Sequence, residues 1–141
     1  MMDERIAKFL ARHHVMTLAT VDDGGRAWCS NEFYAFDSGR AMLIFTSSAD
    51  TAHAAHMSAN PEVAASVVLE TRVVGRVQGC QIRGRAALGD DGARRRYLRR
   101  FPYAAAMLTD AEVWAVTVDY VKFTDNTLGF GKKLIWQRDM L

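Results

Sequence analysis

The feature that most constrains the fold of this chain is a series of short β-branched and apolar runs separated by turn-forming residues. The run Val15–Val21 is followed by Asp22-Asp23-Gly24-Gly25, a composition typical of a hairpin turn. The other strand candidates span residues 26–36, 41–46, 63–69, 77–88, 113–123 and 134–138. Few helical segments separate these runs, which argues against a doubly wound parallel sheet. About six or seven antiparallel strands closing into a small barrel would hide their unpaired edges.

Three segments are predicted to be helices at the periphery of this barrel. Asp3 can cap the first, which carries Ile6, Phe9 and Leu10 on one face. The second spans residues 50–57, begins after a capping residue and ends before Asn60-Pro61. The third is Ala93–Arg100, where Ala93, Tyr97 and Phe101 share a face; a short turn through Met107-Leu108 follows it. The predicted fold class is therefore α+β, a small antiparallel barrel with peripheral helices.

Strand 41–46 is nearly all apolar, so we expect it to be covered on both faces. Strand 77–88 contains Gly79 and Gly84, which permit bends or bulges.

Composition predicts one domain, residues 1–141, that is large enough to bury a core. The formal charge of +2 is too small to imply a nucleic-acid partner. The amino terminus is charged where a signal peptide needs an apolar core, and no apolar run approaches the roughly 20 residues that cross a bilayer. We expect a cytoplasmic protein with no membrane partner, in which Cys29 and Cys80 are reduced and buried.

The closing stretch, residues 123–136, carries the clearest functional pattern. A strand-like run ends at Asp125-Asn126, and Gly129-Phe130-Gly131 then leads to Lys132, Lys133 and Trp136. Two close ammonium groups beside an aromatic ring suit an anionic, planar ligand. The glycines do not form a Walker loop, because Lys133 stands where a Ser or Thr is needed. They do not form a dinucleotide fingerprint either, because Leu134 stands where a glycine is needed.

Two other clusters have weaker functional interpretations. His53 and His56 can share a helix face, but no further ligand pattern accompanies them, so we expect no metal site. Five arginines in the segment Arg94–Arg100 create a local positive field, for which a solvated helix face is the favoured interpretation. Anion or nucleic-acid binding by this helix stays open as an alternative, although no recognised nucleic-acid motif supports it.

Taken together, residues 14–20, 28–36 and 123–136 resemble the flavin-binding split-barrel superfamily that includes pyridoxamine-phosphate oxidases, and a small bacterial branch of it in particular. The resemblance implies a split β-barrel that forms a homodimer and holds flavin mononucleotide (FMN) at the subunit interface. It also implies a phosphate site where the third strand turns into the helix, near Thr46, Ser47, Ser48 and Thr51.

The chain departs from the usual pattern at this turn. Many relatives place a lysine or arginine there, whereas this chain has Asp50 and His53. Asp50 would repel phosphate and, as a helix cap, would compete for the same amides. Lys132 and Lys133, or an arginine of the third helix, are candidates to supply the missing charge across a dimer interface.

The ring of the flavin needs an apolar slot, backbone partners and positive charge near its pyrimidine edge. We expect Trp28, Ser30, Asn31, Gln78 and Gly79 to line that slot. Lys132 or Lys133 would supply charge, and Trp136 would cover one face of the ring. For Trp28 and Trp136, packing in the core or in the dimer is the alternative interpretation.

The sequence therefore predicts a homodimeric FMN-binding protein, with oxidoreductase activity that transfers hydride between flavin and a nicotinamide or another small substrate. No residue stands out as a catalytic acid or base. A module that holds a cofactor without turnover is the alternative on the same barrel, because one fold hosts both kinds.

Overall fold

The computed structural model describes residues 1–106 and 111–139, so the turn expected at Met107-Leu108 lies outside the described residues. The helices are α1 (Glu4–Arg12), α2 (Ala52–Ala59) and α3 (Asp91–Arg100), with short 3-10 turns η1 (Val74–Arg76), η2 (Pro102–Ala106) and η3 (Asn126–Leu128). The strands are β1 (Val15–Val21), β2 (Ala27–Phe33), β3 (Ala35–Asp37), β4 (Met42–Ser48), β5 (Glu62–Val68), β6 (Gln78–Leu88), β7 (Ala111–Asp125) and β8 (Lys133–Gln137).

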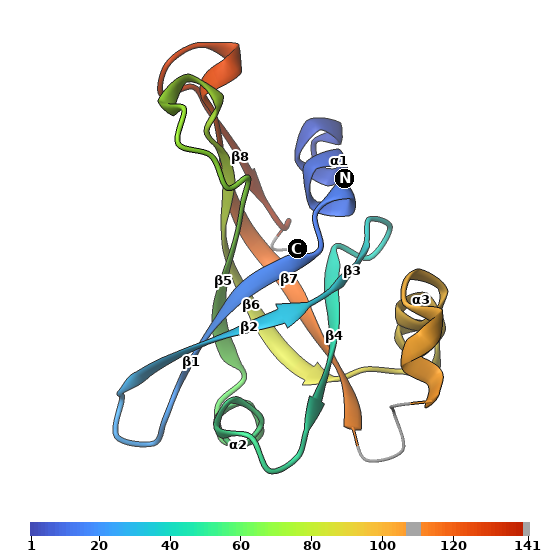
Figure 1. Ribbon diagram of the computed structural model, residues 1–141. Helices are drawn as coiled ribbons and strands as arrows, with labels where there is room; N and C mark the ends of the chain where they lie inside the picture. The colour runs from blue at the N-terminus through green and yellow to red at the C-terminus, as the bar shows by residue number, and fades with distance from the viewer. Residues whose placement is uncertain (107–110, 140–141) are drawn as a thin grey trace.

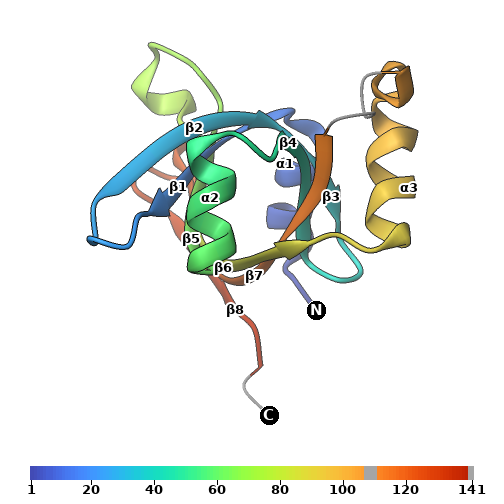
Figure 2. The same ribbon diagram turned by 90° about the horizontal axis from the view of Figure 1, so that it is seen from below.

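All the strands belong to one antiparallel sheet that curls into a split barrel (Figures 1 and 2). The order is β2-β1-β5-β6-β7-β4-β3, and β8 pairs with β7 beside this path. The predicted fold class, an α+β split barrel with peripheral helices, is confirmed.

The described residues contain eight strands where about six or seven were expected, because the segment 26–36 divides in two at Tyr34. The Tyr34 backbone N–H donates to the His14 carbonyl, and its buried hydroxyl donates to the Leu10 carbonyl at 2.6 Å. Burial raises the pKa of Tyr34 well above its usual range, so the hydroxyl stays a donor.

The main core fills the inside of the barrel. Strand alternation sends Met16 and Leu18 of β1 inward, and β5 contributes Val63, Ala65 and Val67 in the same way. Helix α1 lies across one end of the barrel and buries Ile6, Phe9 and Leu10, as its amphipathic pattern predicted.

A second apolar cluster lies on the outer side of β4 and β7, where α3 packs. Its members are Ala35, Ile44, Ala93, Tyr97, Phe101, Ala104, Val113 and Ala115. Strand β4 is therefore covered on both faces, which confirms the interpretation of its apolar run. The predicted buried face of α3 is also confirmed.

Helix α2 closes the barrel at the end opposite the β7–β8 turn (Figure 1). Its N-cap is Thr51, and its buried residues include Ala54 and Met57. The expectation that Asp50 caps this helix is wrong, because Thr51 is the residue whose side chain accepts the Ala54 N–H.

The two cysteines have different environments. Cys80 lies in the core, where burial raises its pKa to about 12 and keeps the thiol protonated. Cys29 is exposed on the edge strand β2, so the expectation that both cysteines are buried is wrong for Cys29. None of the helices in the described part of the chain has the length and apolar character needed to span a bilayer.

A β-bulge interrupts the pairing of β6 with β7 between Arg83 and Gly84. A Cβ atom on Gly84 would lie 2.5 Å from the Thr117 carbonyl oxygen and 2.7 Å from Cγ1 of Val116. The bulge that the sequence allowed is therefore present, and only a glycine at position 84 permits β7 to approach this closely.

We predict that Gly84→Ala lowers the free energy of unfolding by about 1–3 kcal/mol, because the added methyl group must displace backbone atoms. Gly75→Ala is the matched control, since a Cβ atom there meets nothing within 4 Å. Its free energy of unfolding should stay within about 0.5 kcal/mol of wild type. Urea denaturation measures both; equal effects of the two substitutions would contradict the close contact.

Candidate functional site

Polar side chains meet where β4 leads into α2. The Ser47 Oγ lies 2.7 Å from Nε2 of His53 and 3.0 Å from Oγ1 of Thr51. Thr51 Oγ1 also accepts the backbone N–H of Ala54 at 3.2 Å, which satisfies one free amide of the helix. Ser47 points inward, whereas the hydroxyl of its neighbour Thr46 lies on the α3 side, 3.5 Å from the Tyr97 hydroxyl. The predicted cluster is therefore assembled around Ser47, Thr51 and His53.

A carboxylate that the sequence interpretation missed completes this network. Glu32 of β2 places Oε1 3.3 Å from Nε2 of His53, and the two side chains are only 12% and 11% exposed. Glu32 lies opposite Met16 in the β1–β2 register, so it occupies an inward position of its strand. A charged residue at an inward position is the signal that could have identified it.

The arrangement does not form a serine-histidine-acid relay. Both the Ser47 hydroxyl and the Glu32 carboxylate contact the same ring nitrogen of His53, whereas a relay places them on opposite nitrogens. His56 does not join the cluster, because its Nδ1 lies 2.8 Å from the Thr20 hydroxyl.

The α2 end of one chain does not by itself fit a phosphate dianion. The Thr51 hydroxyl donates to the Ser48 carbonyl at 2.9 Å, and the Ser47 hydroxyl has Thr51 Oγ1 at 3.0 Å and the same carbonyl at 3.2 Å as acceptors. Among the described residues, no lysine or arginine is bonded to this network, while the Glu32 carboxylate lies inside it. A phosphate bound here would need cations from elsewhere.

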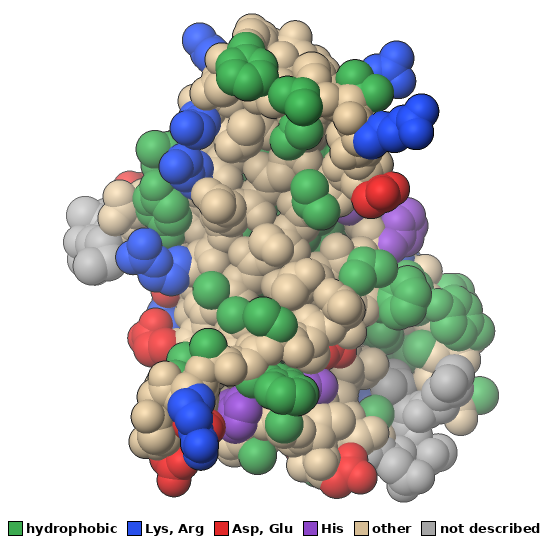
Figure 3. All heavy atoms as spheres, turned by 60° about the vertical axis from the view of Figure 1, so that its left-hand side comes forward, with side chains coloured by type: hydrophobic (Ala, Val, Ile, Leu, Met, Phe, Trp, Pro, Cys, Tyr) green, Lys and Arg blue, Asp and Glu red, His purple; other side chains and the backbone are tan. Residues whose placement is uncertain are grey.

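The outer face of the sheet carries a second set of predicted residues. One cross-strand row takes one residue from each of six strands: Asn31, Thr17, Ser66, Gln81, Lys122 and Ile135. The next row is Cys29, Ala19, Ala64, Arg83, Tyr120 and Gln137. We call these two rows the bare face, because α3 covers only the β3-β4-β7 side of the sheet. Figure 3 shows few charged side chains at its centre and most lysines and arginines near its margins.

Two shallow hollows adjoin on this side of the sheet and share Gln81. One, of about 330 Å³, is lined by residues that include Ser66, Val68, Gly79 and Thr124. The other, of about 310 Å³, includes Ala64, Arg83, Tyr120 and Lys122. Most residues that line the first hollow are small, so a flat ring can approach the backbone there, whereas long side chains such as Arg83 and Tyr120 line the second.

The other predicted residues lie in several different parts of the structure. Gly79, Thr124 and Lys133 form a row beside the first hollow, and Asn31 lies in the bare face, where its Oδ1 accepts the Thr17 hydroxyl at 3.0 Å. Lys132 lies in the β7–β8 turn, at the far end of the barrel from α2 (Figure 1).

Four predicted residues lie outside the rows of the bare face. Ser30 and Trp136 belong to the inward-facing row, and the Ser30 Oγ is buried without a hydrogen-bond partner among the described residues. The guanidinium of Arg138 stacks 5.6 Å from the Trp136 ring centroid. The Gln78 Oε1 accepts a hydrogen bond from Arg12 at 2.6 Å. Trp28 is 53% exposed, so the alternative interpretation that this side chain packs in the core is wrong.

Comparison with known proteins identifies the family. Residues 2–125 match the family described as pyridoxamine 5'-phosphate oxidase, so the chain belongs to that family. It is 44% identical over 138 residues to the UPF0306 protein YhbP of Salmonella paratyphi A, covering 95% of this chain and 92% of the relative. It is 39% identical over 137 residues to the UPF0306 protein plu4501 of Photorhabdus laumondii, with 94% of each chain covered.

Solved structures share the fold at low sequence identity. A heme binding protein from Mycobacterium smegmatis superposes with a TM-score of 0.78 at 18% identity, over 97% of this chain and 59% of that one. A FAD-binding protein from Mesorhizobium loti gives a TM-score of 0.69 at 17% identity, over 85% of this chain and 92% of that one. These likenesses establish the fold alone; proteins of this fold include flavin and heme binders.

We predict that Ser47→Ala lowers the free energy of unfolding by about 1–2 kcal/mol, because it removes the shortest hydrogen bond to the buried His53 nitrogen. Ser58→Ala, on the helix α2 that carries His53, is the control, since its hydroxyl only bonds the Ala54 carbonyl one turn back. That variant should stay within about 0.5 kcal/mol of wild type in urea denaturation. A Ser47→Ala protein as stable as Ser58→Ala would show that the network contributes nothing.

Proposed function

We propose that this protein is a homodimer that binds FMN between the bare faces of its two chains. The observation that carries the proposal is the bare face itself, which is six strands wide, has small side chains on β1 and β5, and is left uncovered by α1, α2 and α3. The exposed side chain of Val68 adds apolar area to that of Ile135 on this side of the sheet, and the exposed Phe33 ring continues it toward Phe101. A soluble chain rarely leaves such a surface in water.

The flavin ring is proposed to lie in the hollow that includes Ser66, Gly79 and Gln81. Gly79 allows the ring to approach the backbone, and the Gln81 amide can bond the pyrimidine edge. Lys133 is in the same cross-strand row as Gly79 and Thr124, where its ammonium group would stabilise negative charge on the ring.

The phosphate requires a contribution from the second chain. A two-fold axis that lies between the two bare faces and runs across the strands would place opposite ends of the two chains side by side, so that the α2 end of one chain would meet the β7–β8 turn of the other. Lys132 and Lys133 of the partner chain would then supply the cations that the α2 end lacks, and would offset the charge of Glu32. Ser48 and the amino end of α2 would donate hydrogen bonds.

When bound, FMN supplies hydride chemistry, while the protein orients the ring and tunes its potential. We propose oxidoreductase activity with a nicotinamide or another small substrate as the donor. Purified protein that binds FMN but gives no turnover with reduced nicotinamides would favour the alternative, a cofactor-binding module on the same barrel.

Heme is a weaker candidate for the same face. Heme iron is commonly held by a histidine. The described histidines lie at the α1–β1 junction (His13 and His14) and in α2 (His53 and His56), and none belongs to the rows of the bare face.

We predict that Ala64→Arg produces a monomer that no longer binds FMN, because it places a charge at the centre of the bare face. Ala59→Arg makes the same change at the exposed carboxyl end of α2, away from the proposed phosphate position, and should leave both the mass and FMN binding unchanged. Light scattering measures the mass, and quenching of flavin fluorescence measures binding.

Two results would contradict the proposal in different ways. A wild-type monomer that binds FMN would rule out the interface site. If the wild-type protein is a dimer that does not bind FMN, and Ala64→Arg still converts it to a monomer, the proposed interface is correct and the proposed cofactor is wrong.

A second prediction concerns the carboxylate at the α2 end. Glu32→Gln should bind FMN more tightly, on the order of fivefold, because it removes a negative charge next to the proposed phosphate position. Glu4→Gln removes an exposed carboxylate of α1 and should leave the affinity unchanged. An unchanged or weaker affinity of Glu32→Gln would place the phosphate away from α2.

A further inference from the structure

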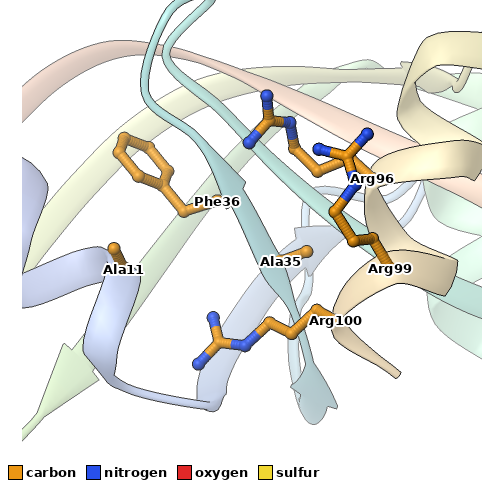
Figure 4. Close-up of a pocket in the computed structure, with 6 residues that line it drawn as sticks. All are labelled: Ala11, Ala35, Phe36, Arg96, Arg99 and Arg100. Carbon is orange, nitrogen blue, oxygen red and sulfur yellow. The ribbon is translucent and has the colours of Figure 1, made fainter. Parts of the chain in front are cut away.

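A small pocket lies between α1, β3 and α3, on a different side of the molecule from the bare face (Figures 1 and 4). Its volume is about 180 Å³, and its lining residues are Ala11, Ala35, Phe36, Arg96, Arg99 and Arg100. Figure 4 shows the guanidinium groups of Arg96 and Arg99 close together above β3, while Arg100 reaches toward α1. Half of the lining residues are therefore cationic, and the others are apolar.

Arg100 is held in place by neutral groups. It donates to the His13 carbonyl at 2.7 Å and to the Tyr34 carbonyl at 3.3 Å, and it stacks 5.7 Å from the Tyr34 ring centroid. The carboxyl end of α1 offsets only about half a unit of its charge. Because a guanidinium has five N–H donors, some remain for another acceptor.

Arg96 and Arg99 are also incompletely neutralised. Arg96 lies 3.5 Å from the Asp37 carboxylate, which Arg40 contacts more closely, at 2.9 Å. Burial alone would raise the pKa of Asp37, but hydrogen bonds from Arg40 bring that pKa below its usual value. Asp37 therefore stays ionised, and Arg40 and Arg96 share its charge. No ion pair to Arg99 is formed within the described residues. The pocket thus keeps a net positive charge.

We propose that this pocket binds the phosphate group of a small phosphomonoester. Two adjacent guanidinium forks match the oxygens of a phosphate, and each can bond it in a bidentate manner. Phe36 and Ala11 form the apolar wall opposite the arginines, where the carbon part of the ester would lie. A volume of about 180 Å³ is below the roughly 300–1,000 Å³ of pockets for drug-sized ligands, so the ligand has few atoms beyond its phosphate.

The site is independent of the proposed flavin site, because the two share no residue. Its ligand is distinct from a nucleic acid, which would track an extended basic surface instead of one small pocket.

The test is calorimetric titration of the full-length chain with inorganic phosphate and with phenyl phosphate. We expect saturable binding of both, tighter for phenyl phosphate because its ring contacts Phe36. Arg96→Gln and Arg99→Gln should each weaken binding about tenfold. Arg94→Gln is the matched control, with the same change of charge on an exposed position of the same helix, and should bind like wild type. Arg100 is left intact, because it anchors α1.

Three outcomes would overturn the proposal. One is the lack of saturable binding of either probe. Another is equal weakening by Arg94→Gln, which would indicate a diffuse field. The third is tighter binding of a single-stranded oligonucleotide than of phenyl phosphate, with the oligonucleotide affinity lowered equally by Arg94→Gln and Arg99→Gln. That result would make α3 a nucleic-acid surface. Thermal unfolding of each variant verifies that it is folded.

Discussion

The structure depends on how the two faces of a single curled sheet are covered. The inward face is filled by the chain's own apolar residues, with α1 and α2 at the two ends of the barrel. On the outward face, α3 covers only the side formed by β3, β4 and β7. The remaining strands β2, β1 and β5 present mainly small, uncharged side chains to the outside, and β6 and β7 add Arg83, Tyr120 and Lys122. Exposed apolar side chains such as Val68 and Ile135 favour association in water, so the uncovered part of the sheet determines where a second chain and a planar cofactor are proposed to bind.

Much of the fold could be predicted because its signals are local. Runs of β-branched residues between turn residues identified the strands, and the continuous apolar run 41–46 correctly indicated a strand covered twice. The errors arise where local signals are ambiguous. Asp50 and Thr51 are both good caps, and only the structure shows that Thr51 accepts the helix amide. The break at Tyr34 depends on its bonds to Leu10 and His14, which come from an earlier part of the chain.

The candidate site was also predictable only where its residues are close in sequence. Ser47, Thr51 and His53 are close in sequence, and the structure places them within hydrogen-bonding distance of one another. Glu32 joins them from another strand, and its role depends on the register of β1 and β2, which composition does not encode. Lys132 and Lys133 lie at the opposite end of the barrel, so whether they meet the α2 end is decided by an assembly that a single sequence does not describe.

The most direct test of the account is a crystal structure of the protein grown with FMN. It should show two chains related by a two-fold axis, joined through their bare faces, with the flavin ring over Gly79 and its phosphate between the α2 end of one chain and Lys132 and Lys133 of the other. A structure in which the bare faces contact only solvent, or in which FMN lies outside the interface, would contradict it.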